Sequence, residues 1–360
     1  EVKNIQTDFN LPRHMPITSL EQAAGTEVHD VIDADLTEPQ ALLGRPLSNR
    51  HAECSDCHNP HRVLRNTLFN ETGLPQATHE HAANHSNIAS GALRGSWGVE
   101  PVYSATQFPT LPINYLVKQG DGGIGASTDV NSIWVTREYQ ICLKCHSDYA
   151  YTDNNAFPTG TRPNLTGTGG GTPPNTNGLT QYTNQAVEFQ SPLTHTGEPA
   201  GLTGSGAGSN FEGGANFNHR SWHPVMSPTL RTTGVRSASA AAWLPPWNSA
   251  VGTQTMYCSD CHGTTTAAES VVPLGNNPWG PHGSTENFIL KGTWDDQTGG
   301  QGRDNPAPDP ANGLCFKCHE KEAYADRNGD NRNSGFGGSK SNNLHAFHTD
   351  NVGSMRCMWC

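Results

Sequence analysis

Hydrophobic positions are sparse along this chain, and few of them repeat with a regular period. Two runs that mix apolar, aromatic and β-branched residues, 103–117 and 131–139, predict short strands. Residues 155–215 are dominated by Gly, Thr, Asn and Pro, and this composition predicts an irregular insertion or linker. No apolar run approaches the roughly 18 residues of a membrane-spanning helix, so no transmembrane segment is expected.

The composition of the chain is unusual for a folded protein. Only 33% of the 360 residues are hydrophobic and 15% are charged, whereas glycine (39) and proline (25) are abundant. Burial of so few apolar side chains cannot by itself offset the conformational entropy lost on folding. The chain is therefore either largely disordered or organised around a group other than its own side chains. Its ten cysteines and 17 histidines favour the second explanation.

The charge balance excludes two classes of partner. Lys and Arg number 22 against 33 Asp and Glu, which gives a formal net charge of −11. Nucleic acids and anionic membranes bind basic patches, so neither is an expected partner. Residues 1–10 lack the basic and apolar regions of a signal peptide. If the protein is exported, as its chemistry suggests, this numbering begins after removal of the signal peptide.

The spacing of the cysteines indicates which cofactor the chain binds. All ten lie in C-x-x-C pairs, and in the first four pairs a histidine follows directly. C-x-x-C-H is the attachment motif of c-type haem, in which two thiols form thioethers and the histidine binds the iron. Structural zinc and redox disulfides also use C-x-x-C pairs, but neither requires the histidine. The haem-attaching cysteines are therefore Cys54, Cys57, Cys142, Cys145, Cys258, Cys261, Cys315, Cys318, Cys357 and Cys360, and the proximal ligands are His58, His146, His262 and His319.

The motifs alternate between two contexts. The first (50–61), the third with its flanks (218–284) and the fifth (343–360) have histidines before the cysteine pair, and the first two have a Pro-His after it. The second (141–151) and fourth (314–324) share an inner lysine and a following aromatic residue. The fifth pair ends the given sequence, so either its histidine lies beyond the sequence or the pair is a terminal disulfide. The alternation favours five haems, with at least four.

The remaining 13 histidines supply distal ligands, which favours two histidines on every iron. Methionine is the rival ligand, but there are only five, and only Met226 and Met355 lie near a motif. Repeated context selects as distal candidates His51, His61, His223, His282, and His345 or His348. His14 and His29 precede every motif, the cluster of His79, His81 and His85 fits one short helix that supplies at most one or two ligands, and His195 is most simply a loop residue.

The expected fold is mostly irregular coil with short α-helices and few short strands, organised around covalently bound c-type haems. Short helices are expected right after the haem motifs, for example at 138–150 and 313–324. Residues 1–154 would hold two haems, 155–215 the insertion, and 216–360 two to three haems. The run DRNGDNRNSG (326–335) resembles a calcium loop but lacks its glycine and glutamate, which favours a polar turn.

These motifs and their CHNPH and GPHGS contexts resemble the extracellular multihaem c-type cytochromes of metal-reducing microbes, including those that polymerise into conductive filaments. The resemblance covers the motif windows, about a quarter of the chain. It implies bis-histidine haems in stacked and T-shaped pairs. It also implies that a histidine of one subunit completes a haem site in the next, with His14, His29 or a histidine near the C-terminus as the candidate.

The expected function is extracellular electron transfer along a row of haems, without enzymatic turnover, as a subunit of a conductive filament. Expected partners are further copies of the chain, redox proteins with basic patches, minerals or electrodes. Two alternatives remain at this point. One is a monomeric periplasmic electron shuttle, and the other is a multihaem reductase, which needs an iron with an open distal position.

Overall fold

We analysed a computed structural model of the chain. The part that it describes comprises residues 5–9, 29, 52–71, 73, 79, 81–82, 85–104, 112–149, 185–189, 223–229, 239–286, 289–293, 313–324, 334 and 345. Residues 103–104 and 112–117 of the predicted 103–117 strand fall within it, whereas the predicted polar turn at 326–335, except for residue 334, and most of the 155–215 insertion lie outside.

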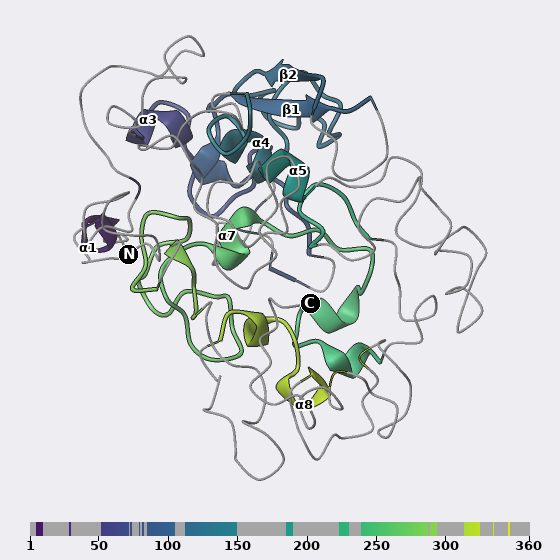
Figure 1. The fold of residues 1–360 in the computed structure, drawn as a ribbon. Coiled ribbons are helices and arrows are strands. Elements are labelled where there is room, and N and C mark those ends of the chain that lie inside the picture. Colours follow the sequence, from purple (N-terminus) through teal and green to yellow (C-terminus); the bar gives the residue numbers. More distant parts are fainter. Residues whose placement is uncertain are drawn as a thin grey trace, which may run out of the picture.

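One two-stranded sheet lies at one end of the described part (Figure 1). β1 (Gly98–Val102) and β2 (Asn114–Lys118) pair antiparallel, with Gly98 opposite Lys118 and Val102 opposite Asn114. β1 faces the interior, where Val99 is fully buried, while Leu116 and Val117 of β2 are exposed. The predicted strand at 103–117 therefore corresponds to β2 at its C-terminal end, and β1 has no counterpart among the predictions.

The predicted strand at 131–139 does not form, because a helix begins inside it. Trp134 and Arg137 make only isolated bridges, to Gln119 and Ile88 respectively. The Gln140 side chain then accepts hydrogen bonds from the backbone N–H groups of Thr136 (2.8 Å) and Arg137 (3.1 Å). These bonds satisfy N–H groups at the start of a helix, so the extended run ends where helix α4 begins.

All described helices are short. They are α1 (Ile5–Phe9), α3 (Cys54–Cys57), α4 (Glu138–Cys142), α5 (Gln185–Glu188), α7 (Cys258–Cys261) and α8 (Lys321–Tyr324), with 3₁₀ turns η2 (Gly91–Leu93), η4 (Ala240–Ala242), η5 (Trp247–Ser249) and η7 (Cys315–Lys317). The predicted helix at 138–150 is thus limited to α4, and that at 313–324 divides into η7 and α8. Among the described residues, no helix is both long and apolar enough to cross a membrane.

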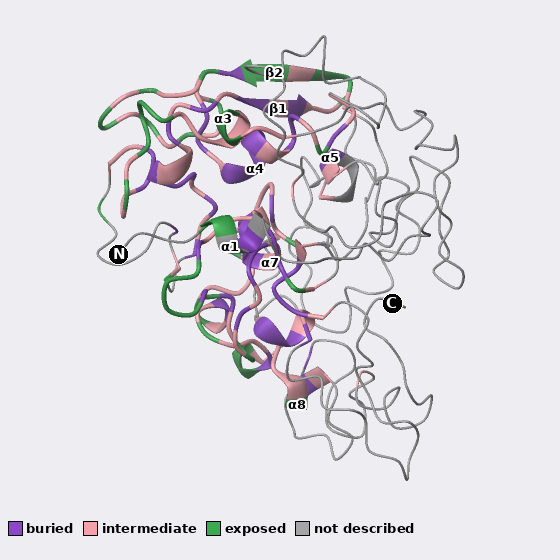
Figure 2. Ribbon diagram, turned by 90° about the vertical axis from the view of Figure 1, so that its left-hand side faces the viewer, coloured by how far each residue is buried: buried purple, intermediate pink, exposed green. Residues whose placement is uncertain are grey.

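The main core draws on both halves of the chain. Val99 and Tyr139 from the first half pack in one cluster with Val225, Trp247 and Met256 from the second. Buried residues concentrate at α4 and α7, as Figure 2 shows, whereas much of the sheet's outer strand is exposed. The cysteine-bearing helices α4 and α7 therefore lie in the best-packed region, where their positions are most strongly fixed.

Candidate functional site

The four complete C-x-x-C-H motifs fold into the same turn. In each, the backbone N–H of the histidine donates to the carbonyl oxygen of the first cysteine, over 2.8 Å at His58, 3.0 Å at His146, 3.0 Å at His262 and 2.9 Å at His319. Residues three apart on such a turn share one face, so the two thiols of a motif lie side by side. After the turn the backbone becomes extended at His58 and His262, which directs the chain away from the cysteines.

The aspartate that the first and third motifs share begins their turns. The backbone N–H of Glu53 donates to Asp56 (2.8 Å), and that of Tyr257 donates to Asp260 at the same distance. Each carboxylate thus satisfies an N–H at the N-terminus of its helix, α3 or α7. This repeated contact explains why both motifs read CSDC.

The lysine that the second and fourth motifs share joins each to the motif before it. Lys144 is buried, donates to the carbonyl oxygen of Asp56 (2.5 Å) and lies 4.6 Å from the centroid of the Trp97 ring. Lys317 is also buried and donates to the carbonyl oxygen of Ala267 (2.8 Å), shortly after the third motif. The first and second motifs, and likewise the third and fourth, are therefore held together by a buried ammonium group.

Three motif histidines face a histidine from a distant part of the sequence. The ring centroids of His58 and His282 are 6.0 Å apart with nearly parallel planes (19°). Those of His146 and His29 are 6.0 Å apart, and those of His319 and His223 are 6.5 Å apart. We call these the three imidazole pairs. Each consists of one proximal histidine expected from a motif and one histidine outside it.

Hydrogen bonds fix which ring nitrogen remains available in two of these pairs. Nδ1 of His58 lies 2.7 Å from the carbonyl oxygen of Ala92, and Nδ1 of His29 lies 2.7 Å from that of Pro281. A carbonyl oxygen only accepts, so Nδ1 carries the proton in both rings. In the neutral imidazole Nε2 is then the free ligand atom, the arrangement usual for metal-binding histidine.

A lowered pKa keeps five of the six paired imidazoles neutral. Burial, with a smaller effect from the neighbouring histidines, lowers the pKa of His146 and His282 to about 4 and that of His319 to about 3. Burial also lowers the pKa of His29 and His223. His146 and His223 nevertheless remain accessible to solvent, so each ring is surrounded by protein without being sealed from water. Neutral imidazole is the form that binds metal.

The eight described cysteines are free of disulfides. Burial raises the pKa of Cys57, Cys145 and Cys261 to about 12, so these thiols are protonated when no metal is bound. Among the described residues, two groups of three or more potential ligand atoms converge within 4.8 Å. Neither group contains both cysteines of a motif, so no four-cysteine zinc site forms there.

The motifs follow one another in space in the order of the sequence. The Cys57 thiol is close enough to Cys142 for an electrostatic interaction, the sulfur atoms of Cys142 and Cys258 lie within 4.8 Å of each other, and Cys261 is close enough to Cys315 to interact electrostatically. Figures 1 and 2 agree, with α3 and α4 near the sheet, α7 in the middle and α8, beside the fourth motif, at the far end. The four C-x-x-C-H turns thus form one row.

The structure separates the predicted distal ligands that lie in an imidazole pair from those that do not. His282 and His223 lie in imidazole pairs, whereas His61, which shares the Pro-His context of His282, is exposed and belongs to none of the three. His345 lies 4.8 Å from the Tyr324 ring, and its Nδ1 is 2.7 Å from Ser334 Oγ. The predicted site residues that lie outside the described part of the chain are His14, His51, His348, Cys357 and Cys360.

His29 is the partner of His146, and the prediction of distal ligands from repeated sequence context did not include it. The sequence marked it only as a candidate for bridging to another subunit, since TEVHD matches no repeated context. In the structure it lies against His146 of its own chain, and its Nδ1 bonds the residue preceding His282. The first two imidazole pairs are therefore adjacent.

The predicted helix containing His79, His81 and His85 is wrong for the described positions, which are not helical. Tertiary contacts determine the conformation instead. His79 Nε2 lies 2.7 Å from Ser259 Oγ and 3.0 Å from Glu138, and His85 contacts Asp260. All three rings therefore pack around α7 and belong to none of the imidazole pairs.

Comparisons with protein families, with characterised proteins and with solved structures found no match to this chain. Its function must therefore be argued from the motifs and the geometry above.

Proposed function

We propose that this protein is a multihaem c-type cytochrome that transfers electrons through haems with two histidine ligands each. The observation that carries the proposal is the set of three imidazole pairs. Two imidazoles on opposite sides of one metal ion, each with a metal–nitrogen bond of about 2 Å, have ring centroids about 6 Å apart. The separations of 6.0, 6.0 and 6.5 Å match this expectation.

The residues around each pair fit a haem. Every pair includes the histidine of a C-x-x-C-H turn, so two thiols lie beside it on one helical face. The histidines with a lowered pKa have neutral rings. His58 and His29 are oriented by the hydrogen bond from Nδ1 to a backbone carbonyl oxygen. The sites would comprise Cys54, Cys57, His58 and His282; Cys142, Cys145, His146 and His29; and Cys315, Cys318, His319 and His223.

Bound haem supplies a one-electron couple, Fe(III)/Fe(II), whose potential depends on its ligands and surroundings. The chain's own contribution is to occupy both axial positions and to fix the distances between sites. Two histidines per iron leave no position for a substrate, which favours electron transfer over a reductase. The row of attachment turns, with neighbouring cysteines in interaction range, supports transfer from one site to the next.

The extracellular and filamentous part of the proposal rests on the resemblance of the motif windows. A bridging histidine would then be His14 or one near the C-terminus, because His29 has a partner in its own chain. A monomeric shuttle would use the same haem chemistry without polymerisation. Negative-stain microscopy separates the two: filaments of micrometre scale are expected, and a clean monomer at high protein concentration would refute polymerisation while leaving the electron-transfer proposal intact.

The electron-transfer proposal is tested by spectroscopy on the haem-loaded protein. We expect low-spin spectra in both oxidation states and no rapid binding of carbon monoxide to the reduced protein, because two imidazole ligands on an iron leave no axial position open. A substantial high-spin signal together with rapid carbon monoxide binding would contradict the proposal and support the multihaem reductase.

A further inference from the structure

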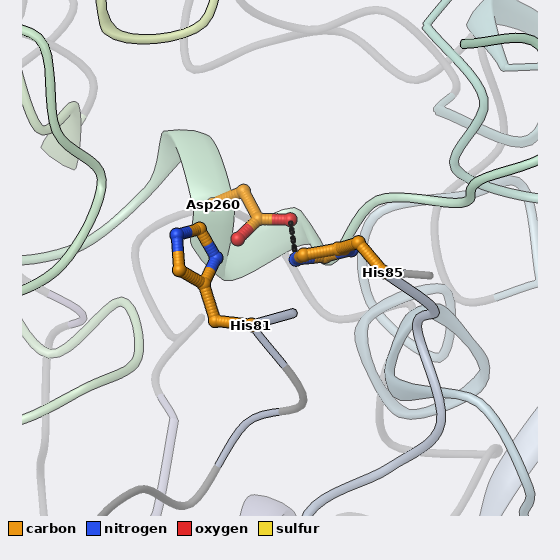
Figure 3. A group of neighbouring side chains, drawn as sticks. All are labelled: His81, His85 and Asp260. Atoms are coloured by element: carbon orange, nitrogen blue, oxygen red, sulfur yellow. Dashed lines mark ion pairs between the residues drawn. The ribbon is translucent and has the colours of Figure 1, made fainter. Parts of the chain in front are cut away.

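A second histidine cluster lies beside the row of attachment turns and takes no part in the imidazole pairs. It comprises His81, His85 and Asp260, and Figure 3 shows one ring nitrogen of His81 and one of His85 directed toward the carboxylate of Asp260. Three ligand atoms, one from each residue, lie within 4.8 Å of one another. His85 Nε2 is 3.4 Å from Asp260 Oδ2, and both side chains are completely buried.

We propose that His81, His85 and Asp260 form a binding site for one divalent transition-metal ion, with zinc as the expected occupant. Two imidazoles and one carboxylate form a common protein ligand set for zinc, with water completing the coordination. Bonds of about 2 Å would bring the ligand atoms to about 3–4 Å from one another. The His85–Asp260 distance already lies in that range, so mainly His81 has to move.

Two buried atoms of the cluster point to an absent ligand. Within the described residues, Nδ1 of His81 and Oδ1 of Asp260 are inaccessible to solvent and have no hydrogen-bond partner. A polar atom in this state is costly unless something binds it. One cation between the three side chains would satisfy both atoms at once.

The surroundings orient the ligands as metal sites usually do. Nδ1 of His85 lies 2.7 Å from the carbonyl oxygen of Thr255, so Nδ1 carries the proton and Nε2 faces Asp260. The backbone N–H of Tyr257 donates to the same oxygen of Asp260, Oδ2, at 2.8 Å and so holds the carboxylate in place. The orientations of His85 and Asp260 are therefore set before any ion binds.

The arrangement suits an ion better than a haem. The rings of His81 and His85 are perpendicular (89°), with centroids 5.3 Å apart, and a carboxylate lies against both. The second converging group, Glu138 with Cys142 and Cys258, is excluded as a metal site because its cysteines belong to attachment motifs. Bound zinc would connect the 81–85 segment to α7 and so stabilise the third attachment turn.

One nearby charge opposes the ion and offers a test. Lys291 is completely buried, donates to the carbonyl oxygen of Val271 (2.7 Å) and lies 4.5 Å from the Trp279 ring centroid. It is close enough to Asp260 to interact electrostatically, although no ion pair joins the two in the described part of the chain. Its positive charge weakens cation binding, so Lys291→Met is expected to tighten it.

The experiment measures zinc on the haem-loaded full chain by metal analysis and by zinc-edge X-ray absorption, which is separate from the iron edge. We expect one zinc per chain with nitrogen and oxygen ligands at about 2.0–2.1 Å. Asp260→Asn and His81→Gln should weaken binding more than about tenfold. The matched control is Asp56→Asn, because Asp56 begins its helix through the same 2.8 Å contact.

The outcomes separate this proposal from the haem assignment. Unchanged zinc affinity in Asp260→Asn, sulfur ligands at the zinc edge, or equal losses in Asp56→Asn would each overturn it. Haem content is measured in parallel by mass, so a variant that lost haem attachment would be recognised. In that event His81→Gln, which lies outside every motif, provides the deciding comparison.

Discussion

The pair formed by His58 and His282 allows a sharp test of the ligand assignment. His282→Ala removes one ring of the pair, whose centroids are 6.0 Å apart, and leaves the motif histidine in place. The iron at that site would lose one axial ligand and become high-spin, while the other sites keep theirs. The Pro281 carbonyl, which accepts from His29, belongs to the backbone and is retained, so the neighbouring pair should not change.

The size of the effect follows from the number of attachment motifs. One site among four or five should convert, so between a fifth and a quarter of the haem becomes high-spin. Electron paramagnetic resonance of the oxidised protein measures this fraction, and carbon monoxide titration of the reduced protein should give one binding site per chain. Wild-type protein should give neither signal.

The chain contains a matched control for this variant. His61 also follows a Pro in the Pro-His context of an attachment motif, but it is exposed and belongs to no imidazole pair. His61→Ala should therefore leave the spectra unchanged. The pairing of His58 with His282 would be refuted if His282→Ala remained fully low-spin, or if the two variants converted the same fraction of haem.

Two further predictions concern stability. Lys144→Met should reduce the free energy of unfolding by about 2 kcal/mol, because it removes a charge-assisted hydrogen bond to the carbonyl of Asp56 and the contact with the Trp97 ring. Urea unfolding at fixed pH measures this loss. An unchanged unfolding midpoint would contradict the role of Lys144 in joining the first two motifs. Gly95→Ala should cost about 1–3 kcal/mol more than Gly123→Ala. Both glycines have a positive φ (88° and 87°), but only at Gly95 would a Cβ lie 2.7 Å from a side-chain carbon; equal thermal unfolding temperatures in the two variants would contradict this packing.

The four C-x-x-C-H turns could be located from the sequence because their geometry is local. The histidine follows the first cysteine by four residues, so across one helical turn its backbone N–H donates to the carbonyl oxygen of that cysteine. All four described motifs have this hydrogen bond. The alternation of inner residues also had structural meaning, since Asp56 and Asp260 cap their helices while Lys144 and Lys317 join neighbouring motifs.

The distal partners could not be predicted with the same certainty because they depend on long-range packing. His61 and His282 have the same local context, yet only His282 is brought to a motif histidine. His29 has no repeated context, and its position is set by Pro281, far along the chain. The strand predicted at 131–139 failed for a related reason, since the capping bonds of Gln140 outweigh the local preference for extended backbone.

The intact mass of the purified protein tests the central proposal most directly. Covalent attachment through the C-x-x-C-H turns predicts a mass that exceeds the polypeptide by four or five haems and that persists under denaturing conditions, because thioethers do not dissociate. Five would mean that the pair at Cys357 and Cys360 also carries haem, and four would mean that it does not. A mass equal to the bare polypeptide, or to the polypeptide with internal disulfides, would contradict the assignment of this chain as a multihaem cytochrome.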